Sequence, residues 1–363
     1  MNVAIMGAGL SGLSCAMILE KHGIRPTIFE KRGAVGDRFA NGEIMLSFLS
    51  RPVTDEIAYF SDQYGVYLQP TSHIHHLILH SERRKAVVSG HLGFCNLRGN
   101  DPKSFEYQLA RQVQSEIVFD ARETYEQLSN DYTHVIMATG DAAYALKMQN
   151  YRLDFAAKLN GCRVSGNFDR YAVHAWLNNK FAPYGYGYLI PISEKEADLV
   201  LWYPEYCDSN QRQDPAFLLD QFYHQASRDL DQKITLISRF EVHGYQVGIC
   251  RAPRIGNTYF TGNCFGAITP YLGFGQFVAI STGIYAALDL CRLGKYEELT
   301  KPLRKNYENS LVLRRAWEQY DNRQFDWMTR FFGSWLGNKI LTAQRLDAVK
   351  IASFIARPGI KPR

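Results

Sequence analysis

The sequence lacks long hydrophobic runs, paired cysteines and nucleophile motifs. No stretch approaches the roughly 20 consecutive apolar residues that a bilayer-spanning helix needs. The seven cysteines are odd in number and scattered, with no Cys-X-X-Cys pair for a zinc site or a redox dithiol. Reduced thiols in the cytoplasm are therefore expected. No Ser-His-Asp or catalytic cysteine signature is present, so nothing in the sequence indicates a hydrolase.

The sequence also offers little to a metal ion. Four histidines fall between residues 73 and 80, but a regular strand would divide them. His73 and His75 would lie on one face, and His76 and His80 would lie on the other with Ile74. A tetrahedral zinc site needs four ligands close together, and a divided set does not supply them. We therefore predict no metal here and a half-exposed strand of a second domain.

The composition is that of a folded protein. The length of 363 residues predicts roughly two domains, and 46% hydrophobic with 21% charged residues is typical of folded chains. The 22 tyrosines and 21 phenylalanines indicate either large cores, or a large apolar cavity or membrane-facing surface. Charge is uneven: residues 295–363 hold 14 Lys/Arg and 7 Asp/Glu, a balance of +7 in a chain of net charge +5. The rest of the chain therefore carries −2.

The first thirty residues carry a dinucleotide-binding pattern. A short apolar run at residues 3–6, typical of a buried parallel strand, leads into Gly7, Gly9 and Gly12 of a Gly-X-Gly-X-X-Gly motif. The first glycine allows a tight turn, the second lets a pyrophosphate approach the backbone, and the third lets the next helix pack closely on the strand. Glu30 ends the following apolar run, 18 residues after Gly12, where a carboxylate would accept hydrogen bonds from a ribose. The predicted cofactor contacts in this segment are Gly7, Gly9, Leu10, Ser11, Gly12, Glu30 and Lys31.

Two later segments carry glycine turns that could approach the same dinucleotide. Residues 134–140 form an apolar run that ends at Gly140, and residues 259–275 form a second run and a glycine-lined loop before an apolar helix at 276–287. Backbone N–H groups at the start of a helix face the anionic or electron-rich end of a ligand in many proteins. Alone, each segment would be read as an ordinary buried strand ending in a turn. Together they predict a site assembled from three parts of the chain.

The spacing of Gly262, Gly266, Pro270, Gly273 and Gly275 matches a known flavoprotein motif. With the opening glycines, it resembles the flavoprotein monooxygenase-like superfamily. Within that superfamily the sequence is most similar to the geranylgeranyl reductase family, whose motif reads GDAAG followed by Pro and GxG. The resemblance implies FAD as the cofactor, and NAD(P)H or another reductant as the electron donor.

The same resemblance implies further cofactor contacts. Asn263 stands where the family has an aspartate that binds the ribityl chain of FAD, and its amide both accepts and donates hydrogen bonds. Arg38 falls where the family often has a basic residue near FAD, and Gln108 lies in a stretch that resembles the family's FAD-side helix. The predicted contacts outside the N-terminal segment are Arg38, Gln108, Gly140, Gly262, Asn263, Gly273, Phe274 and Gly275.

Residues 183–191 are similar to the family's substrate-side motif YxWxFP, with Tyr188 in place of the tryptophan. In a strand, Tyr184, Tyr186 and Tyr188 would lie on one face, and the intervening glycines would leave the opposite face open. Such a face suits a flat flavin and an apolar chain. The alternative is an ordinary aromatic ladder in a sheet. The predicted substrate contacts are Tyr184, Tyr186, Tyr188, Pro270 and Tyr271.

The C-terminal region, residues 295–363, is predicted to be helical. Apolar residues recur at helical spacing from Tyr296 to Leu311, and bulky apolar side chains crowd residues 325–336 among basic ones. A basic segment with tryptophans is typical of a surface that contacts an anionic membrane, or of a lid over an apolar pocket. The alternative is a tail packed on the body of the protein. No nucleic-acid-binding motif occurs, so nucleic acid is not an expected partner.

These observations predict an α/β protein with a Rossmann-type FAD-binding domain interleaved with an antiparallel-sheet substrate domain, and a helical C-terminal region. The predicted FAD-binding domain comprises residues 1–70, 95–150 and 250–294, and the substrate domain comprises residues 71–94 and 151–249. The expected location is the cytoplasm, peripheral to the inner face of the membrane if the tail docks there.

The family resemblance implies reduction of carbon–carbon double bonds in an isoprenoid or other lipid-like substrate. The flavin, rather than a protein side chain, is expected to carry the electrons. Because the same fold hosts other chemistry, two alternatives stay open. One is an FAD-dependent monooxygenase acting on a small aromatic or apolar substrate. The other is a non-catalytic flavin-binding protein with a membrane-docking tail.

Overall fold

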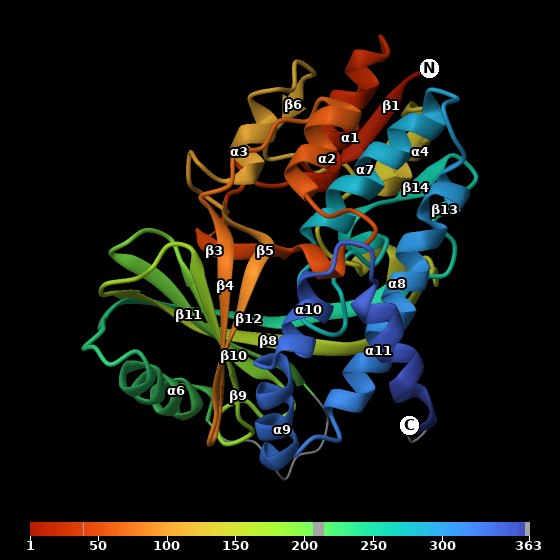
Figure 1. The fold of residues 1–363 in the computed structure, drawn as a ribbon. Helices are drawn as coiled ribbons and strands as arrows, with labels where there is room; N and C mark the ends of the chain where they lie inside the picture. Colours follow the sequence, from red (N-terminus) through yellow and green to blue (C-terminus); the bar gives the residue numbers. More distant parts are fainter. Residues whose placement is uncertain (39, 206–213, 360–363) are drawn as a thin grey trace.

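The computed structural model describes residues 1–38, 40–205 and 214–359. Two β-sheets lie next to each other, and the C-terminal helices run beside them (Figure 1). One sheet is mostly parallel and the other mostly antiparallel. The predicted α/β class, with a Rossmann-type sheet, a second antiparallel sheet and a helical C-terminal region, is confirmed.

The first sheet has six strands, and the central ones run parallel. Parallel pairing joins β1 to β2 and β7, β7 to β14, and β2 to β6, whereas β13 pairs antiparallel with β14 at one edge. In spatial order the strands are β13 (Arg254–Ile255), β14 (Thr258–Phe260), β7 (His134–Met137), β1 (Val3–Met6), β2 (Thr27–Phe29) and β6 (Ile117–Val118).

The second sheet has eight strands. Its pairs are antiparallel except for β4 with β9, which run parallel. In spatial order the strands are β12 (Thr235–Cys250), β8 (Tyr151–Ser165), β11 (Glu196–Glu205), β10 (Tyr186–Pro191), β9 (Ala172–Leu177), β4 (Ser72–Ser81), β5 (Lys85–Arg98) and β3 (Asn41–Leu46).

The helices pack on these sheets and on one another. No helix in the described part of the chain is long and apolar enough to cross a membrane. The helices are α1 (Leu10–Lys21), α2 (Glu56–Tyr64), α3 (Phe105–Ala110), α4 (Tyr125–Asp131), α5 (Ala143–Lys147), α6 (Pro215–Asp229), α7 (Gln276–Leu290), α8 (Tyr296–Trp317), α9 (Asn322–Phe332), α10 (Trp335–Thr342) and α11 (Ala348–Ala356), with short 3-10 turns η1 (Ser47–Leu49), η3 (Gly262–Cys264) and η4 (Arg357–Gly359).

Strand β1 is buried on both faces, which explains its unbroken apolar run. Val3 and Ile5 belong to the core shared with α1 and α7, whereas Ala4 and Met6 belong to the core shared with α4 and α5 on the other face. Parallel strands are usually covered in this way by helices on both sides. Alternate side chains of the strand therefore pack in two separate cores.

The chain crosses between the two sheets more often than its motifs suggest. Strand β3 lies within residues 1–70 of the predicted FAD-binding domain but pairs with β5 in the second sheet. Strand β5 runs without a break across the predicted boundary at residue 95. Motif positions carry no information on which distant segments pair, so the predicted boundaries could not follow these strands.

Strand β4, which holds the four clustered histidines, contains a β-bulge. Its register against β5 shifts between Ile74 and His76, and a bulge reverses the alternation of side chains beyond it. Ile74 consequently packs in the same core as Leu79, while His80 stacks on Trp176, which belongs to a different core. The prediction that Ile74 shares a face with His80 was wrong for this reason. Among the residues described, no group of three His, Cys, Asp or Glu side chains could hold a metal ion.

Candidate active site

Three glycine turns from distant parts of the chain meet at one edge of the first sheet. Gly7 follows β1, Gly140 follows β7 and Gly262 follows β14, and these three strands are adjacent and parallel. The turns are in close contact: a Cβ on Gly7 would lie 2.3 Å from the carbonyl oxygen of Ala138, and one on Gly262 would lie 2.6 Å from Oγ of Ser11. A side chain at either position would collide with its neighbour, so the turns come this close only because both residues are glycine.

A cavity of about 340 Å³ opens where the turns meet, and we call it the glycine-lined cavity. Helices α1 and α7 both begin at its wall, and neither has a side chain that caps its first N–H groups. Free N–H groups at a helix start carry partial positive charge, so the cavity favours an anionic or electron-rich ligand. The predicted cofactor contacts that line it are Gly7, Gly9, Leu10, Ser11, Glu30, Lys31, Arg38, Gly140, Gly262, Asn263, Gly273 and Gly275.

Gly9 and Glu30 shape the part of the cavity beside α1. No atom lies within 4 Å of the position that a Cβ on Gly9 would take, so the backbone there is open to a ligand. The carboxylate of Glu30 accepts hydrogen bonds from the backbone N–H groups of Ala8 (2.8 Å) and Arg32 (3.1 Å), which fix it at the end of β2. Across the gap, the side-chain amide of Asn263 donates to a backbone carbonyl of the β7 turn (2.7 Å) and ties two of the glycine turns together.

Three of the predicted cofactor contacts lie outside the glycine-lined cavity, and for two of them, Gly12 and Gln108, the reason is local. Gly12 sits behind it, where a Cβ would lie 2.0 Å from the carbonyl oxygen of Gly7, so it serves helix packing as the third glycine of the motif should. The structure does not bring Gln108 into the cavity. Its side-chain amide instead bonds the backbone of Gln69 and Lys103 and holds α3 to the neighbouring loop.

Charged side chains from β3, β5 and α3, together with Gln276 of α7, form another part of the cavity wall. Arg98 donates to Glu106 (2.8 Å) and to Glu43 (3.2 Å), and Gln276 also donates to Glu43 (2.7 Å). Burial by itself would raise the pKa of Glu43, but the charges of Arg98 and Arg38 and the hydrogen bond from Gln276 outweigh it. The pKa of Glu43 therefore lies below its ordinary value, and the carboxylate stays ionised at neutral pH.

Two buried atoms of this network lack a hydrogen-bond partner within the described residues, Nη2 of Arg38 and Oε2 of Glu106. A buried polar atom without a partner is costly, so both atoms suit a ligand that would supply one. The family resemblance found Arg38, but sequence reasoning missed Glu43, Arg98 and Glu106. These residues lie on β3, β5 and α3, and no local motif links them.

A second cavity, of about 280 Å³, shares the loop from Leu272 to Gly275 with the first. Leu272 and Phe274 line the second cavity, whereas Gly273 and Gly275 line the glycine-lined one. Phe274, predicted to contact the cofactor, thus faces the other side of the loop. The two cavities are therefore neighbours at this loop.

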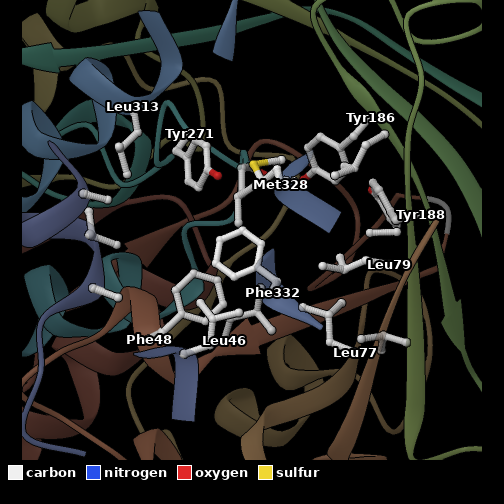
Figure 2. A pocket seen from close by; sticks show the side chains of 18 of the residues that line it. Leu46, Phe48, Leu77, Leu79, Tyr186, Tyr188, Tyr271, Leu313, Met328 and Phe332 are labelled. Carbon is white, nitrogen blue, oxygen red and sulfur yellow. Dashed lines mark hydrogen bonds between the residues drawn. The ribbon is translucent and has the colours of Figure 1, made fainter. Parts of the chain in front are cut away.

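This second cavity is apolar, and we call it the apolar cavity. Among the described residues, its lining contains no Asp, Glu, Lys or Arg. Figure 2 shows Met328 and Phe332 of α9 with Tyr186 and Tyr188 of β10 to one side and Tyr271 to the other. Burial raises the pKa of all three tyrosines well above the ordinary value, so their hydroxyls remain neutral.

Only some of the predicted substrate contacts lie at the apolar cavity. Tyr186, Tyr188 and Tyr271 line the apolar cavity, whereas Tyr184 and Pro270 do not. Tyr184 precedes the strand and has a left-handed backbone with φ of 57°, so the alternation that begins at Tyr186 does not extend to it. Pro270 is buried beside the loop without reaching either cavity.

The sequence suggested that the glycines of this segment would leave the opposite face of β10 open. The structure shows that this face is covered instead. A Cβ on Gly187 would lie 2.5 Å from the ring of Phe222, which comes from α6. The missing side chain makes room for that ring in the core between α6 and the sheet. The face that carries Tyr186 and Tyr188 therefore lines the apolar cavity, whereas the opposite face packs against α6 at Gly187.

One family of domains matches the sequence, described as an NAD(P)-binding Rossmann-like domain, over residues 5–50. No curated protein matches it. Several solved structures are similar over the whole chain. They include a geranylgeranyl bacteriochlorophyll reductase-like protein from Thermoplasma acidophilum (TM-score 0.73, 16% identity, covering 98% of this chain and 96% of that one). The flavin-dependent halogenase CmlS (0.67, 13%, 99% and 76%) and aklavinone-11 hydroxylase with FAD and aklavinone (0.58, 14%, 90% and 70%) are others.

At these identities the likeness establishes the fold. The chain has the fold of these flavoproteins, and its likeness to the geranylgeranyl bacteriochlorophyll reductase-like protein covers 98% of its length. The same fold carries reductase-like, halogenating and hydroxylating proteins. Reaction and substrate must therefore be argued from the two cavities.

Proposed function

We propose that the protein is an FAD-dependent oxidoreductase that reduces carbon–carbon double bonds in an isoprenoid or other lipid-like substrate. One observation carries the proposal: the polar, glycine-lined cavity and the apolar cavity share the loop 272–275 as a wall. A flavin in the first cavity would meet an apolar chain in the second across that loop. The flavin dependence of the halogenase and the FAD held by the hydroxylase support the choice of cofactor.

The residues of the glycine-lined cavity fit FAD. The open backbone at Gly9 and the start of α1 would receive the pyrophosphate, and Glu30 would accept hydrogen bonds from the ribose. The uncapped start of α7, at Gly275, would face the electron-rich end of the isoalloxazine. Asn263 lies between these two sites and lines the same cavity. Nη2 of Arg38 and Oε2 of Glu106, which lack a hydrogen-bond partner within the described residues, give the cavity further polar groups for a ligand.

The apolar cavity fits a chain of hydrocarbon rather than a polar molecule. Leaving a polar group unpaired in such surroundings costs about 1–3 kcal/mol, whereas each methylene that enters gains about 0.8 kcal/mol. The lining offers few partners, since the hydroxyl of Tyr186 already donates to the carbonyl of Leu272. Tyr188 and Phe274 lie edge to face at 6.0 Å beside the shared loop and keep water from it.

When bound in its reduced form, FAD would supply a hydride to one carbon of the double bond and the accompanying proton to the other, and would be left oxidised. NAD(P)H or another reductant would restore the reduced flavin. The protein's own contribution is to position the chain and exclude water, since the charged groups of the site lie on the glycine-lined side of the wall.

The test uses the purified protein with its flavin reduced by dithionite without oxygen. Mixing with geranylgeraniol should restore the absorbance of oxidised flavin, and mass spectrometry should show products heavier by H2 per reduced double bond. A flavin that stays reduced with this alkene, yet is rapidly oxidised by oxygen with substrate-stimulated NAD(P)H consumption, would overturn the proposal in favour of a monooxygenase.

The monooxygenase alternative has support of its own. Aklavinone-11 hydroxylase has a similar fold, and the position of the two cavities beside one loop does not by itself distinguish oxygen chemistry from hydride transfer. A small aromatic substrate would then occupy the apolar cavity. If protein that retains its flavin turns over neither alkenes nor aromatic compounds, the remaining alternative is a non-catalytic flavin-binding protein.

A further inference from the structure

The last three long helices expose an unusual number of large apolar side chains. Nineteen large hydrophobic residues are exposed in the described part of the chain, and seven of them lie on α9–α11 or the loops between them. The most exposed are Phe354 (78%), Trp335 (75%) and Ile355 (72%). The seven, which we call the apolar rim, are Trp327, Trp335, Leu336, Leu346, Ile351, Phe354 and Ile355.

On α9 and α10 the apolar rim lies one helical turn from the lining of the apolar cavity. Trp327 stacks on Phe331 at 5.6 Å, and Phe331 lines the cavity. Leu336 stands four residues before Ile340, another lining residue, and residues four apart are neighbours on a helix surface. The rim therefore continues from the cavity wall to the surface on both helices.

Helix α11 forms part of the mouth itself. Ile351 and Ile355 are exposed and also line the apolar cavity, so the cavity reaches the surface between them and the other two helices. Phe354 lies three residues after Ile351, on the adjoining strip of the same helix. A cavity with an apolar wall thus opens through an apolar mouth.

Exposed cations lie on the same helices and loops as the apolar rim. Six basic residues of this region are exposed, and none of them forms an ion pair within residues 1–38, 40–205 and 214–359. The three acidic residues of the same segment are engaged elsewhere: Asp321 and Asp347 cap α9 and α11, and Asp326 bonds Ser81 and a backbone N–H of the second sheet. The six are Arg323, Arg330, Lys339, Arg345, Lys350 and Arg357.

We propose that the apolar rim docks on an anionic membrane and opens the apolar cavity to the bilayer. Bulky apolar side chains interleaved with unpaired cations match an interface of acyl chains and anionic headgroups. Lys339 lies over the ring of Trp335, which places a cation and an aromatic ring together on this surface. The docking rests on the rim and its charge, whereas the passage of substrate through the mouth rests on the proposed function.

A lipid-like substrate gives this placement a physical reason. A chain that fits the apolar cavity is poorly soluble in water and is stored in a membrane, so a mouth in contact with the bilayer lets it move without crossing water. A protein partner would bury the same rim but would not need six unpaired cations of one sign. The charge therefore favours the membrane.

Vesicle co-sedimentation tests the docking. The full chain should sediment with vesicles of phosphatidylcholine and phosphatidylglycerol, bind those of phosphatidylcholine alone much more weakly, and release from the anionic vesicles as salt is raised. The double variant F354S/I355S should reduce the binding at least about tenfold, because two exposed apolar side chains no longer enter the interface. The control F217S/I237S changes two exposed apolar residues outside the rim, on α6 and β12, and should bind like the wild type.

Tryptophan fluorescence gives a second readout. Of the five tryptophans, Trp327 and Trp335 are exposed and the other three are buried, so a blue shift on adding anionic vesicles reports the rim. Loss of the shift in F354S/I355S is expected. The proposal would be overturned if the wild type neither sediments with anionic vesicles nor shows the blue shift, or if the control variant loses binding equally. It would also be overturned if the rim only mediates association between protein molecules. Because neither assay needs flavin or turnover, failure of the proposed function would leave this result unchanged.

Discussion

At the scale of single residues, the candidate site depends on positions where a side chain is absent. Gly7, Gly12 and Gly262 are glycines because a Cβ would collide with a neighbouring turn or helix. Gly9 differs from them: a side chain there would meet no protein atom and would occupy ligand space instead. Its backbone has φ of −91°, which any residue adopts without strain. A substitution at Gly9 is therefore expected to weaken ligand binding with little effect on folding.

The first prediction concerns Gly9→Val. We expect FAD to bind at least about a hundredfold more weakly, while the protein without cofactor loses no more than about 1 kcal/mol of stability, the cost of a poor residue at a helix start. Fluorescence titration with FAD and urea unfolding measure the two effects. Gly359→Val, at another open position without a left-handed backbone, should change neither. Normal FAD affinity in Gly9→Val would contradict the placement of the cofactor.

The second prediction concerns the carboxylate of Glu43. Because its pKa is lowered in the folded protein, its contribution to stability is complete above the ordinary value near 4.5 and is lost as the pH falls through the folded pKa. We expect Glu43→Gln to reduce the free energy of unfolding by about 1–3 kcal/mol at neutral pH, because Arg98 loses a charged partner, and by less in acid.

Urea unfolding of the wild type and of Glu43→Gln at neutral and acidic pH measures this difference. Glu298→Gln serves as the control, since Glu298 pairs with Lys301 on the exposed surface of α8 and should matter by at most about 0.5 kcal/mol. A difference between wild type and Glu43→Gln that grows as the pH falls would show that the sign is wrong.

At the scale of elements, β10 shows what sequence reasoning reaches and what it does not. The alternation of aromatic residues correctly placed Tyr186 and Tyr188 on one face. It could not show that the strand begins only at Tyr186, because the left-handed turn at Tyr184 leaves no mark in the pattern. Nor could it show that Gly187 faces the ring of Phe222, which lies on a helix far along the chain.

The third prediction follows from that contact between β10 and α6. Gly187→Ala should destabilise the protein by about 1–3 kcal/mol, because the added methyl group has to displace a packed ring. Phe222→Ala alone should cost about 3–5 kcal/mol through the cavity that it leaves. In the double variant the methyl group would lie in that cavity, so the combined cost in urea unfolding should be smaller than the sum. Simple additivity would contradict the packing of Phe222 against Gly187.

At the scale of the whole molecule, the parts of the fold that follow from a local sequence pattern could be predicted, whereas the parts that depend on pairing between distant segments could not. The strand, glycine turn, helix and acidic residue of the first thirty positions are a continuous local signal, and they predicted the parallel sheet and its edge. The eight-stranded sheet depends on pairings such as β3 with β5 and β4 with β9, which join segments far apart. The ionic wall of Glu43, Arg98 and Glu106 is invisible in the sequence for the same reason.

The fourth prediction concerns the stability of the whole chain. A ligand that binds only the folded state stabilises it by mass action, by about 2.7 kcal/mol at a hundredfold excess over its Kd. The cofactor would bridge three glycine turns and the starts of α1 and α7, so FAD should raise the Tm of the cofactor-free protein measurably. Differential scanning fluorimetry, with Gly9→Val as the comparison, measures the shift. An equal rise in that variant would place the binding elsewhere.

The most direct test of the account is the cofactor itself. The absorption spectrum of the purified protein, before and after heat denaturation releases its ligand, would show whether FAD occupies the glycine-lined cavity. We predict the spectrum of a bound flavin and release of one FAD per chain, either as purified or after incubation with FAD. A colourless protein that takes up no FAD under any condition would contradict the convergence of the glycine turns on one dinucleotide, and the proposed chemistry with it.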